Sequence, residues 1–303
     1  MRTELEERRA PLLNDVIFHY VFAHEAGINC LKTLVNTVLE ASGFRVVQQI
    51  QIRNPFNLGE FAEGKQSVID IRARDSDGRW FNIEVQNLPH SGFFSRTLYY
   101  WATTYSHQLI VGDRYTELDP TFGIHFIGFP LLPKPWPLHA HVELRMPQFK
   151  DRFLTDQLSL EYLDFSQLSS FTFGDILDNK LLSLMYFLMH KGRSEDTHMA
   201  EIEKKYPELN EINTRFKKAL HDDSVWIEAE RREKFARDQI AIRQYAEEEG
   251  IEKGKDLGRT EVLSQMVTNM RSQGFSWEQI SAISGRSIKE LTQLPGTSKD
   301  LDS

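Results

Sequence analysis

The sequence predicts an α/β fold with a helical C-terminal region. In the first half of the chain, segments with apolar residues every three or four positions alternate with short segments typical of strands. From Leu177 onward, almost every apolar segment has the helical period. With 303 residues, of which 40% are hydrophobic and 26% charged, the chain is long enough for one large domain with additions and is neither fibrous nor globally disordered.

Three helices are expected in the first half of the chain. The first covers residues 14–26, where Asn14 is a suitable N-cap and Asp15 places an acid in the first turn. The second covers residues 28–41 and ends at the Ser-Gly pair that follows it. The third covers residues 91–111 and ends before a glycine.

Strands are expected where the apolar period shortens to two. They cover residues 45–52, 66–73, 79–86 and 122–129, with further strands at 139–146 and 158–163. A proline-rich connector at 130–137 precedes these last two strands.

The second half of the chain is expected to form a series of helices. They cover 177–190, 198–220 with a break near Pro207, 222–249, 260–273, 276–284 and 287–294. Glycines recur every fourth residue at 250, 254 and 258. Because each interior glycine costs a helix about 1 kcal/mol relative to alanine, the segment 250–259 is either a frayed linker or a marginal helix. The expected parts are therefore a core at 1–170, a helical extension at 171–249, the linker, and a small helical tail at 260–303.

The overall charge is not that of a strongly basic nucleic-acid-binding protein. The chain has 36 basic and 44 acidic residues, a net charge of -8. Residues 1–150 carry 15 basic and 16 acidic side chains, which leaves 21 and 28 for residues 151–303. Because nucleic-acid binding depends on a local patch, the near-neutral first half can still hold a basic groove.

Several protein classes are disfavoured by simple features of the sequence. No run approaches the ~18 apolar residues of a membrane span, and the charged N-terminal segment lacks the apolar stretch of a secretory signal. The single cysteine, Cys30, excludes an intramolecular disulfide and a multi-cysteine zinc site. His139 and His141 share a strand face, but no third histidine or cysteine stands at a recognisable zinc-site spacing. We expect a cytoplasmic protein with no membrane partner.

The most informative segment is the hairpin expected between residues 70 and 86. A two-residue loop would pair Asp70 with Val85 and put the two acids on opposite faces. A three-residue loop that ends at a left-handed Gly78 pairs Asp70 with Glu84 instead. Only this second loop puts the apolar residues of both strands on the same side. The polar residues that then share the opposite face are Asp70, Asn82, Glu84 and Gln86.

Two carboxylates and an amide oxygen held side by side on strands suit a hard divalent cation such as Mg²⁺ or Mn²⁺. Such an ion lowers the pKa of bound water and stabilises charge at a phosphodiester. An acidic pair on a hairpin is by itself more often a solvated sheet face. The position of Asp70 inside the apolar run 68–71 favours the metal site.

Several motifs also follow one another in a characteristic order. They are Asn14-Asp15 with Phe18 and Phe22, Val68-Ile69-Asp70-Ile71, Ile83-Glu84-Val85-Gln86, Arg96 with Tyr100, Tyr105 to Tyr115, Ile127-Gly128-Phe129, the glycines at 250–258, and Gly274 to Ile280. Over residues 12–290, this order and spacing resemble the PD-(D/E)XK nuclease superfamily, and more narrowly the Rpn family of recombination-promoting nucleases and transposases. The resemblance implies a restriction-endonuclease-like fold, in which a mixed central sheet is flanked by helices, with residues 1–170 as the nuclease-like core.

The resemblance implies a set of metal ligands. Asp70 and Glu84 would bind the metal, with help from the carbonyl of Val85. Asp15 would complete the acidic cluster from the first helix, although a plain helix cap explains this residue equally well.

The resemblance also implies how the substrate would be held. Gln86 stands where most nucleases of the superfamily have lysine, so it would position water or bind the metal rather than supply a positive charge. Arg96 and Tyr100, one helical turn apart, would contact phosphate.

Two functions follow as hypotheses. The first is a Mg²⁺-dependent DNA endonuclease that resembles nucleases of DNA recombination; RNA as the substrate is not excluded, because it shares the phosphodiester chemistry. The alternative is a nucleic-acid-binding or regulatory protein with an inactive nuclease fold, which Gln86 and the net charge of -8 favour. We expect the helical tail to serve packing or a homo-oligomer rather than DNA reading, because its last helix offers only Lys289.

Overall fold

The structure is a computed structural model that describes residues 10–54, 70–87, 89, 92–131, 136–149, 154–192 and 197–297. The chain divides into two compact units, residues 1–233 and residues 234–303. The first part of the expected strand at 66–73 lies outside the described residues.

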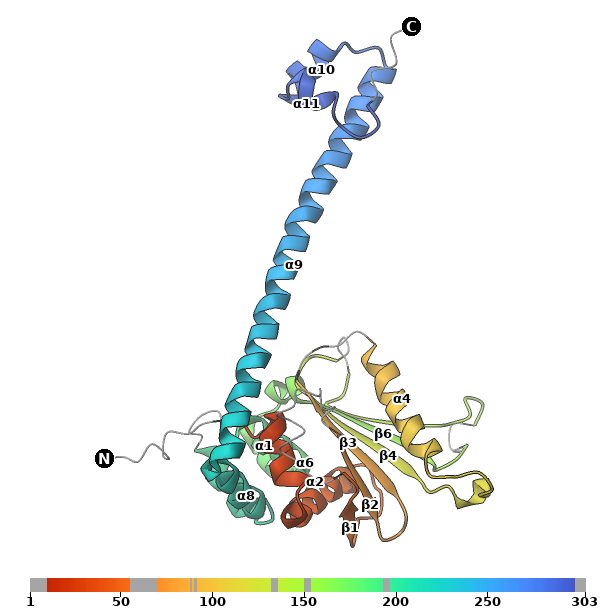
Figure 1. The fold of residues 1–303 in the computed structure, drawn as a ribbon, viewed down its shortest axis with the longest axis vertical. Coiled ribbons are helices and arrows are strands. Elements are labelled where there is room, and N and C mark those ends of the chain that lie inside the picture. The colour runs from red at the N-terminus through yellow and green to blue at the C-terminus, as the bar shows by residue number, and fades with distance from the viewer. Residues whose placement is uncertain are drawn as a thin grey trace, which may run out of the picture. The chain divides into compact units, whose positions relative to one another are not determined.

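A six-stranded sheet forms the centre of the first unit (Figure 1). Its strands are β1 (Ile50–Ile52), β2 (Asp70–Asp75), β3 (Trp80–Gln86), β4 (Thr121–Ile127), β5 (His139–Glu143) and β6 (Leu158–Asp164). They follow the order β1-β2-β3-β4-β6-β5. The β3–β4 and β4–β6 pairs are parallel and the other pairs are antiparallel. The predicted α/β fold with a mixed central sheet is therefore confirmed.

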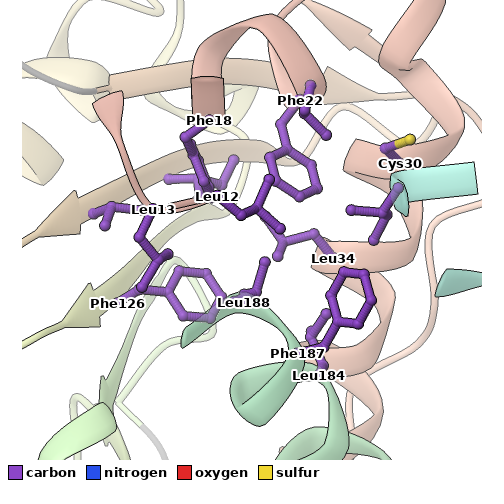
Figure 2. Packing of buried hydrophobic residues seen from close by; sticks show 14 of the residues in the cluster. Leu12, Leu13, Phe18, Phe22, Cys30, Leu34, Phe126, Leu184, Phe187 and Leu188 are labelled. Carbon is purple, nitrogen blue, oxygen red and sulfur yellow. The ribbon is translucent and has the colours of Figure 1, made fainter. Parts of the chain in front are cut away.

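Helices cover both faces of this sheet (Figure 1). The larger core includes residues of α1 (Asp15–Phe22), α2 (Ile28–Ala41), α6 (Lys180–His190) and α8 (Leu209–His221). Figure 2 shows Phe18 and Phe22 of α1 packed near Leu34 of α2 and near Phe187 and Leu188 of α6. The opposite face of the sheet carries α4 (Phe93–Ser106), which contacts β3 and β4. The remaining elements of this unit are η2 (Glu25–Gly27), η3 (Tyr115–Glu117), η4 (Phe165–Ser170), α5 (Phe173–Asp178) and α7 (His198–Lys205).

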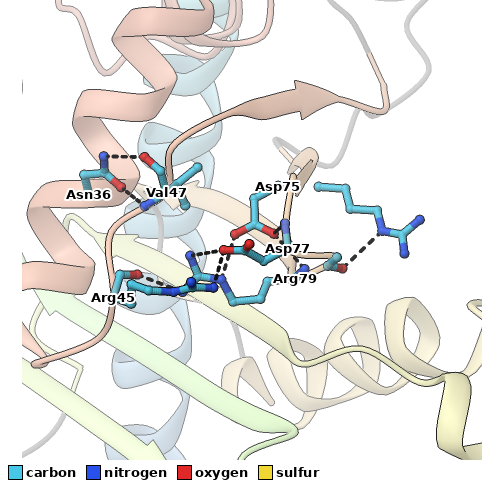
Figure 3. A network of polar contacts seen from close by, with 8 residues as sticks. Asn36, Arg45, Val47, Asp75, Asp77 and Arg79 are labelled. Carbon is cyan, nitrogen blue, oxygen red and sulfur yellow. Dashed lines mark hydrogen bonds and ion pairs between the residues drawn. The ribbon is translucent and has the colours of Figure 1, made fainter.

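The hairpin between β2 and β3 adopts the predicted register, in which Asp70 pairs with Glu84. Gly78 has a φ of 91°, a backbone conformation that side chains with a Cβ rarely adopt. The loop is closed by Asp75, whose Oδ1 accepts hydrogen bonds from the backbone amides of Asp77 at 2.9 Å and Arg79 at 2.8 Å (Figure 3). The three-residue loop is therefore confirmed.

Some elements are shorter than their apolar patterns predict. The strand expected at 45–52 is reduced to β1, because the side chain of Asn36 on α2 binds both backbone groups of Val47 (Figure 3). The helix expected at 177–190 is divided in two, because Asn179 ends α5 and its side chain caps the start of α6. The strand expected at 139–146 ends at Glu143. The break expected near Pro207 is present between α7 and α8.

The helix α9 (Asp223–Ser272) begins in the first unit and continues into the second. The expected linker at 250–259 lies inside this helix, so its glycines occupy helical positions. The second unit also contains α10 (Trp277–Ser284) and α11 (Ile288–Leu291), each of which begins with a serine capping box. The boundaries expected at residues 170, 249 and 259 stay predictions. Among the described residues, no helix combines the length and apolar character of a membrane span.

Candidate active site

The candidate site lies on the face of β3 that α4 covers. Successive side chains of a strand point to opposite faces, and the odd-numbered residues of β3, including Ile83 and Val85, belong to the main core. Glu84 and Gln86 therefore lie on the α4 face. Asp70 pairs directly with Glu84, and paired residues share a face of the sheet. The register thus places Asp70, Glu84 and Gln86 on one face, as the alternation of apolar residues predicts.

Arg96, in the first turn of α4, joins two of these residues. Its Nη2 donates hydrogen bonds to Oε1 of Glu84 and, at 2.6 Å, to Oε1 of Gln86. The side chain of Glu84 is only 2% exposed, whereas that of Arg96 is 24% exposed. Because a buried carboxylate is costly without a partner, Arg96 supplies the countercharge of Glu84. The predicted contact of Arg96 with phosphate stays a prediction.

The structure adds His125, a buried histidine on β4 that the sequence pattern does not predict. Parallel pairing places it opposite Glu84, with Nδ1 at 3.4 Å from Oε2 of Glu84. The imidazole stacks on the ring of Tyr162 with a centroid distance of 5.2 Å. A Cβ at position 123 would lie 2.8 Å from Nε2 of His125, so Gly123 leaves the space that the imidazole needs. The available signal was a polar residue within an otherwise apolar strand.

Two buried acceptor atoms on the same face support a cation or water site. Oε2 of Glu84 and Oδ1 of Asn82 have no hydrogen-bond partner among the described residues. Buried polar atoms are nearly always satisfied, so such atoms call for a bound ion or water. Carboxylate and amide oxygens are the ligands that Mg²⁺ prefers. The described side chains form no complete cluster of three metal-binding acids, histidines or cysteines, and Asp70 would have to add its oxygen atoms to those of Glu84 and Gln86.

The start of α1 approaches the carboxyl end of β3. The side-chain amide of Asn87, directly after β3, donates a 3.0 Å hydrogen bond to the carbonyl of Leu13. Asn14 caps the helix as predicted. Asp15 lies 3.8 Å from Arg232 of α9, and burial raises the pKa of its carboxyl group although Arg232 opposes this effect. Asp15 thus follows two residues after Leu13, which contacts the residue after β3, but its carboxylate is paired with an arginine.

The two remaining predicted residues differ in their surroundings. The side chain of Val85 is buried in the main core, so only its backbone carbonyl is available as a ligand. Tyr100 is half-buried on α4, one turn after Arg96, and its ring lies 5.8 Å from that of Tyr99. The ligand role of Val85 and the phosphate contact of Tyr100 stay predictions.

The histidine pair on β5 is hydrogen-bonded to another carboxylate, that of Glu161. Nε2 of His139 and Nδ1 of His141 each lie 2.7 Å from the carboxylate of Glu161 on β6, which also accepts hydrogen bonds from Ser42 and Ser159. Burial would raise the pKa of Glu161, but the hydrogen bonds from His139, His141 and Ser42 outweigh it and lower this pKa to about 2. Both imidazoles are therefore bound to a buried carboxylate.

Comparison with known proteins places the chain in a family. No curated protein and no solved structure matches the chain. A family described as "PD-(D/E)XK nuclease family transposase" matches residues 12–246, which include the whole sheet and every predicted site residue. Because this match covers well over half of the chain, the protein belongs to the PD-(D/E)XK nuclease family of transposases.

Proposed function

We propose that the protein is a Mg²⁺- or Mn²⁺-dependent endonuclease that hydrolyses phosphodiester bonds in DNA. The observation that carries the proposal is the buried carboxylate of Glu84, which is paired across the hairpin with Asp70 and has one unsatisfied oxygen. Family membership supports a nucleic acid as the substrate. A carboxylate pair on rigid strands gives a divalent cation a fixed position beside the scissile phosphate.

Each residue of the site would have a separate role in the hydrolysis. The bound cation would supply positive charge at the phosphate and acidify water. Asp70 and Glu84, with the carbonyl of Val85 and the carboxylate of Asp15, would hold it. Gln86 would orient the attacking water through its side-chain amide, since an amide has no charge to contribute.

Arg96 and Tyr100 would bind the substrate phosphate in this mechanism. The guanidinium of Arg96 is now bound to Glu84 and Gln86. To reach a phosphate, it must release Glu84, whose charge the cation then balances. Arg96 therefore exchanges one anionic partner for another without leaving a buried charge unpaired.

A second candidate function is a nucleic-acid-binding protein with no nuclease activity. The specific observation in its favour is that Arg96 already occupies Oε1 of both Glu84 and Gln86. If Arg96 keeps this position, the two residues have fewer free oxygens for a cation. Calorimetric titration discriminates the functions, because absence of binding at millimolar Mg²⁺ or Mn²⁺ would favour the inactive protein.

The proposal is tested by nicking of supercoiled plasmid DNA. We expect cleavage by the wild type in Mg²⁺, none in excess chelator, and a rate at least about 100-fold lower for Glu84→Gln and Asp70→Asn, because each loses a cation ligand. Glu143→Gln, an acid-to-amide change on β5, is the matched control and should cleave normally. Nicking that persists in chelator or in both site variants would refute the metal mechanism, and a parallel reaction with an RNA transcript identifies the preferred nucleic acid.

A further inference from the structure

A row of arginines continues the candidate site towards the β1 edge of the sheet. Arg72 pairs with Asn82 and Arg74 pairs with Trp80, so all four lie on the face that carries Asp70 and Glu84. Beyond them at the edge, the amide of Arg53 donates a 2.7 Å hydrogen bond to the carbonyl of Arg72. We call Arg53, Arg72, Arg74 and Trp80 the arginine face.

An independent contact confirms that Arg53 belongs to this face. Its guanidinium carbon lies 5.9 Å from the centre of the Trp80 ring, and that of Arg74 lies 5.5 Å from the same ring. These distances are within the range of cation–π attraction. Both arginines therefore contact one half-buried indole.

The arginines of this face differ in their countercharges. Arg74 is held by Asp119 at 2.6 Å and by the carbonyl of Gly78 at 3.1 Å, so it is largely neutralised and fixes the position of Trp80. Arg53 is exposed and Arg72 is half-buried. Within the described part of the chain, neither has a carboxylate at ion-pair distance. In a protein of net charge -8, two arginines beside the candidate site that have no carboxylate partner among the described residues are notable.

The spacing of these residues suits a polymer with regularly placed phosphates. Rows two residues apart along an antiparallel strand are about 7 Å apart. Arg53 and Arg72 therefore stand one row away from Asp70 and Glu84, and Trp80 stands two rows away. A chain that places its scissile phosphate at Glu84 would bring its next phosphates to Arg53 and Arg72.

We propose that the arginine face binds the nucleic-acid strand that enters the site, with phosphates on Arg53 and Arg72 and an unpaired base stacked on Trp80. The inference rests on the proposed nuclease function and adds the substrate class, a single-stranded or locally opened nucleic acid. An intact duplex keeps its bases stacked inside and offers only phosphates, whereas an indole next to arginines is a stacking platform for an unpaired base.

The test measures binding separately from cleavage. A fluorescein-labelled single-stranded DNA oligonucleotide is titrated in excess chelator and followed by fluorescence anisotropy at several salt concentrations. For the Arg53→Gln/Arg72→Gln variant we expect about tenfold weaker binding. The slope of log Kd against log salt concentration should be lower by about 1.4, because two phosphate contacts are lost. Arg145→Gln is the matched control and should bind like the wild type, because Arg145 follows β5, the edge strand at the opposite end of the sheet from β1.

A second pair of variants tests the stacked base. Trp80→Leu should bind the single strand at least about fivefold more weakly, whereas Trp80→Phe should retain most of the affinity because it keeps an aromatic face. The duplex of the same sequence should bind more weakly than the single strand to the wild type. Melting temperatures near that of the wild type establish that each variant is folded.

The outcomes separate this inference from the proposed function. Any of four results would overturn the proposed role of the arginine face. They are unchanged affinity and salt dependence in the double arginine variant, equal losses of affinity for Trp80→Leu and Trp80→Phe, tighter binding of the duplex than of the single strand, and no binding by the wild type. Weakened binding in the expected variants together with no metal-dependent nicking would support the arginine face and refute the nuclease. Nicking that requires Glu84, together with unchanged binding in the variants, would support the nuclease and refute the proposed role of the arginine face.

Discussion

At the scale of single residues, the central feature is the ion pair between Glu84 and Arg96. Glu84 is 2% exposed, so its charge depends on a partner within the protein. Oε1 accepts from Arg96, whereas Oε2 is left without a hydrogen bond among the described residues. The guanidinium of Arg96 thus binds one oxygen of the Glu84 carboxylate, whereas a divalent cation can bind both.

This arrangement predicts a metal-dependent stability for an Arg96 variant. Without metal, Arg96→Gln should lower the free energy of unfolding by about 2–4 kcal/mol, because the buried charge of Glu84 loses its arginine partner. Millimolar Mg²⁺ should raise the melting temperature of this variant more than that of the wild type. Arg114→Gln is the matched control, since its exposed pair with Glu117 contributes less than about 1 kcal/mol. An equal rise in the melting temperatures of the wild type and the Arg96→Gln variant on addition of Mg²⁺ would contradict a cation site at Glu84.

The sequence predicts part of this constellation and misses part for a physical reason. The apolar alternation of two neighbouring strands determines the hairpin register, so the Asp70–Glu84 pairing follows from local information. His125 comes to Glu84 through the parallel β3–β4 pairing, which joins segments about 40 residues apart through a helix. No local pattern specifies that register, and a single buried histidine has many ordinary explanations.

At the scale of elements, the edge strand β5 is connected to the rest of the unit by Glu161. This carboxylate on β6 binds His139 and His141 of β5, and also Ser42 after α2. Its side chain is fully buried. The network therefore joins the edge of the sheet to the end of a core helix.

We expect this network to make stability depend on pH. The pKa of Glu161 is lowered from 4.5 to about 2, so its stabilisation is complete above the unfolded value and is lost as the pH falls towards 2. The hydrogen bond to Glu161 raises the pKa of His141, so that contribution is present at low pH and is lost as the pH rises through the folded value. Urea unfolding of wild type and Glu161→Gln should show a stability difference that shrinks by on the order of 3 kcal/mol between pH 6 and pH 2. A difference independent of pH would contradict this assignment.

Element boundaries are less predictable from the sequence than element types. The helix 28–41 is confirmed to the residue, because its apolar face and its end are both encoded locally. The segment 250–259 is helical despite three glycines, and ion pairs such as Lys253 with Glu249 at 2.6 Å support it. β1 is short because Asn36, on the preceding helix α2, binds the backbone of Val47, and the alternation of apolar residues within 45–52 gives no sign of that contact.

At the scale of the whole molecule, the core of the first unit includes the first turns of α9. Val225 is 2% exposed and Ala229 is fully buried. The side-chain amide of Asn14 donates a 2.9 Å hydrogen bond to the carbonyl of Ala229. The first unit therefore needs α9 at least as far as this residue.

Two truncated chains test this requirement. A chain that ends after Glu233 keeps both core residues and the bond from Asn14, whereas a chain that ends after His221 loses all three. We expect the shorter chain to be less stable in urea by about 3 kcal/mol, from the lost apolar burial and the unsatisfied amide of Asn14. Equal stability of the two chains would show that α9 contributes nothing to the core.

Cys30 gives the whole molecule a useful chemical property. It is the single cysteine of the sequence, it lies fully buried in the main core (Figure 2), and burial raises its pKa to about 12. Its thiol is therefore protonated and shielded at neutral pH, where maleimide reagents attack accessible thiolates. A cysteine introduced at any exposed position would react alone. Spin labels or fluorophore pairs can thus be attached along α9 and on α4 without removing a native residue, and the motions of both can be followed in solution.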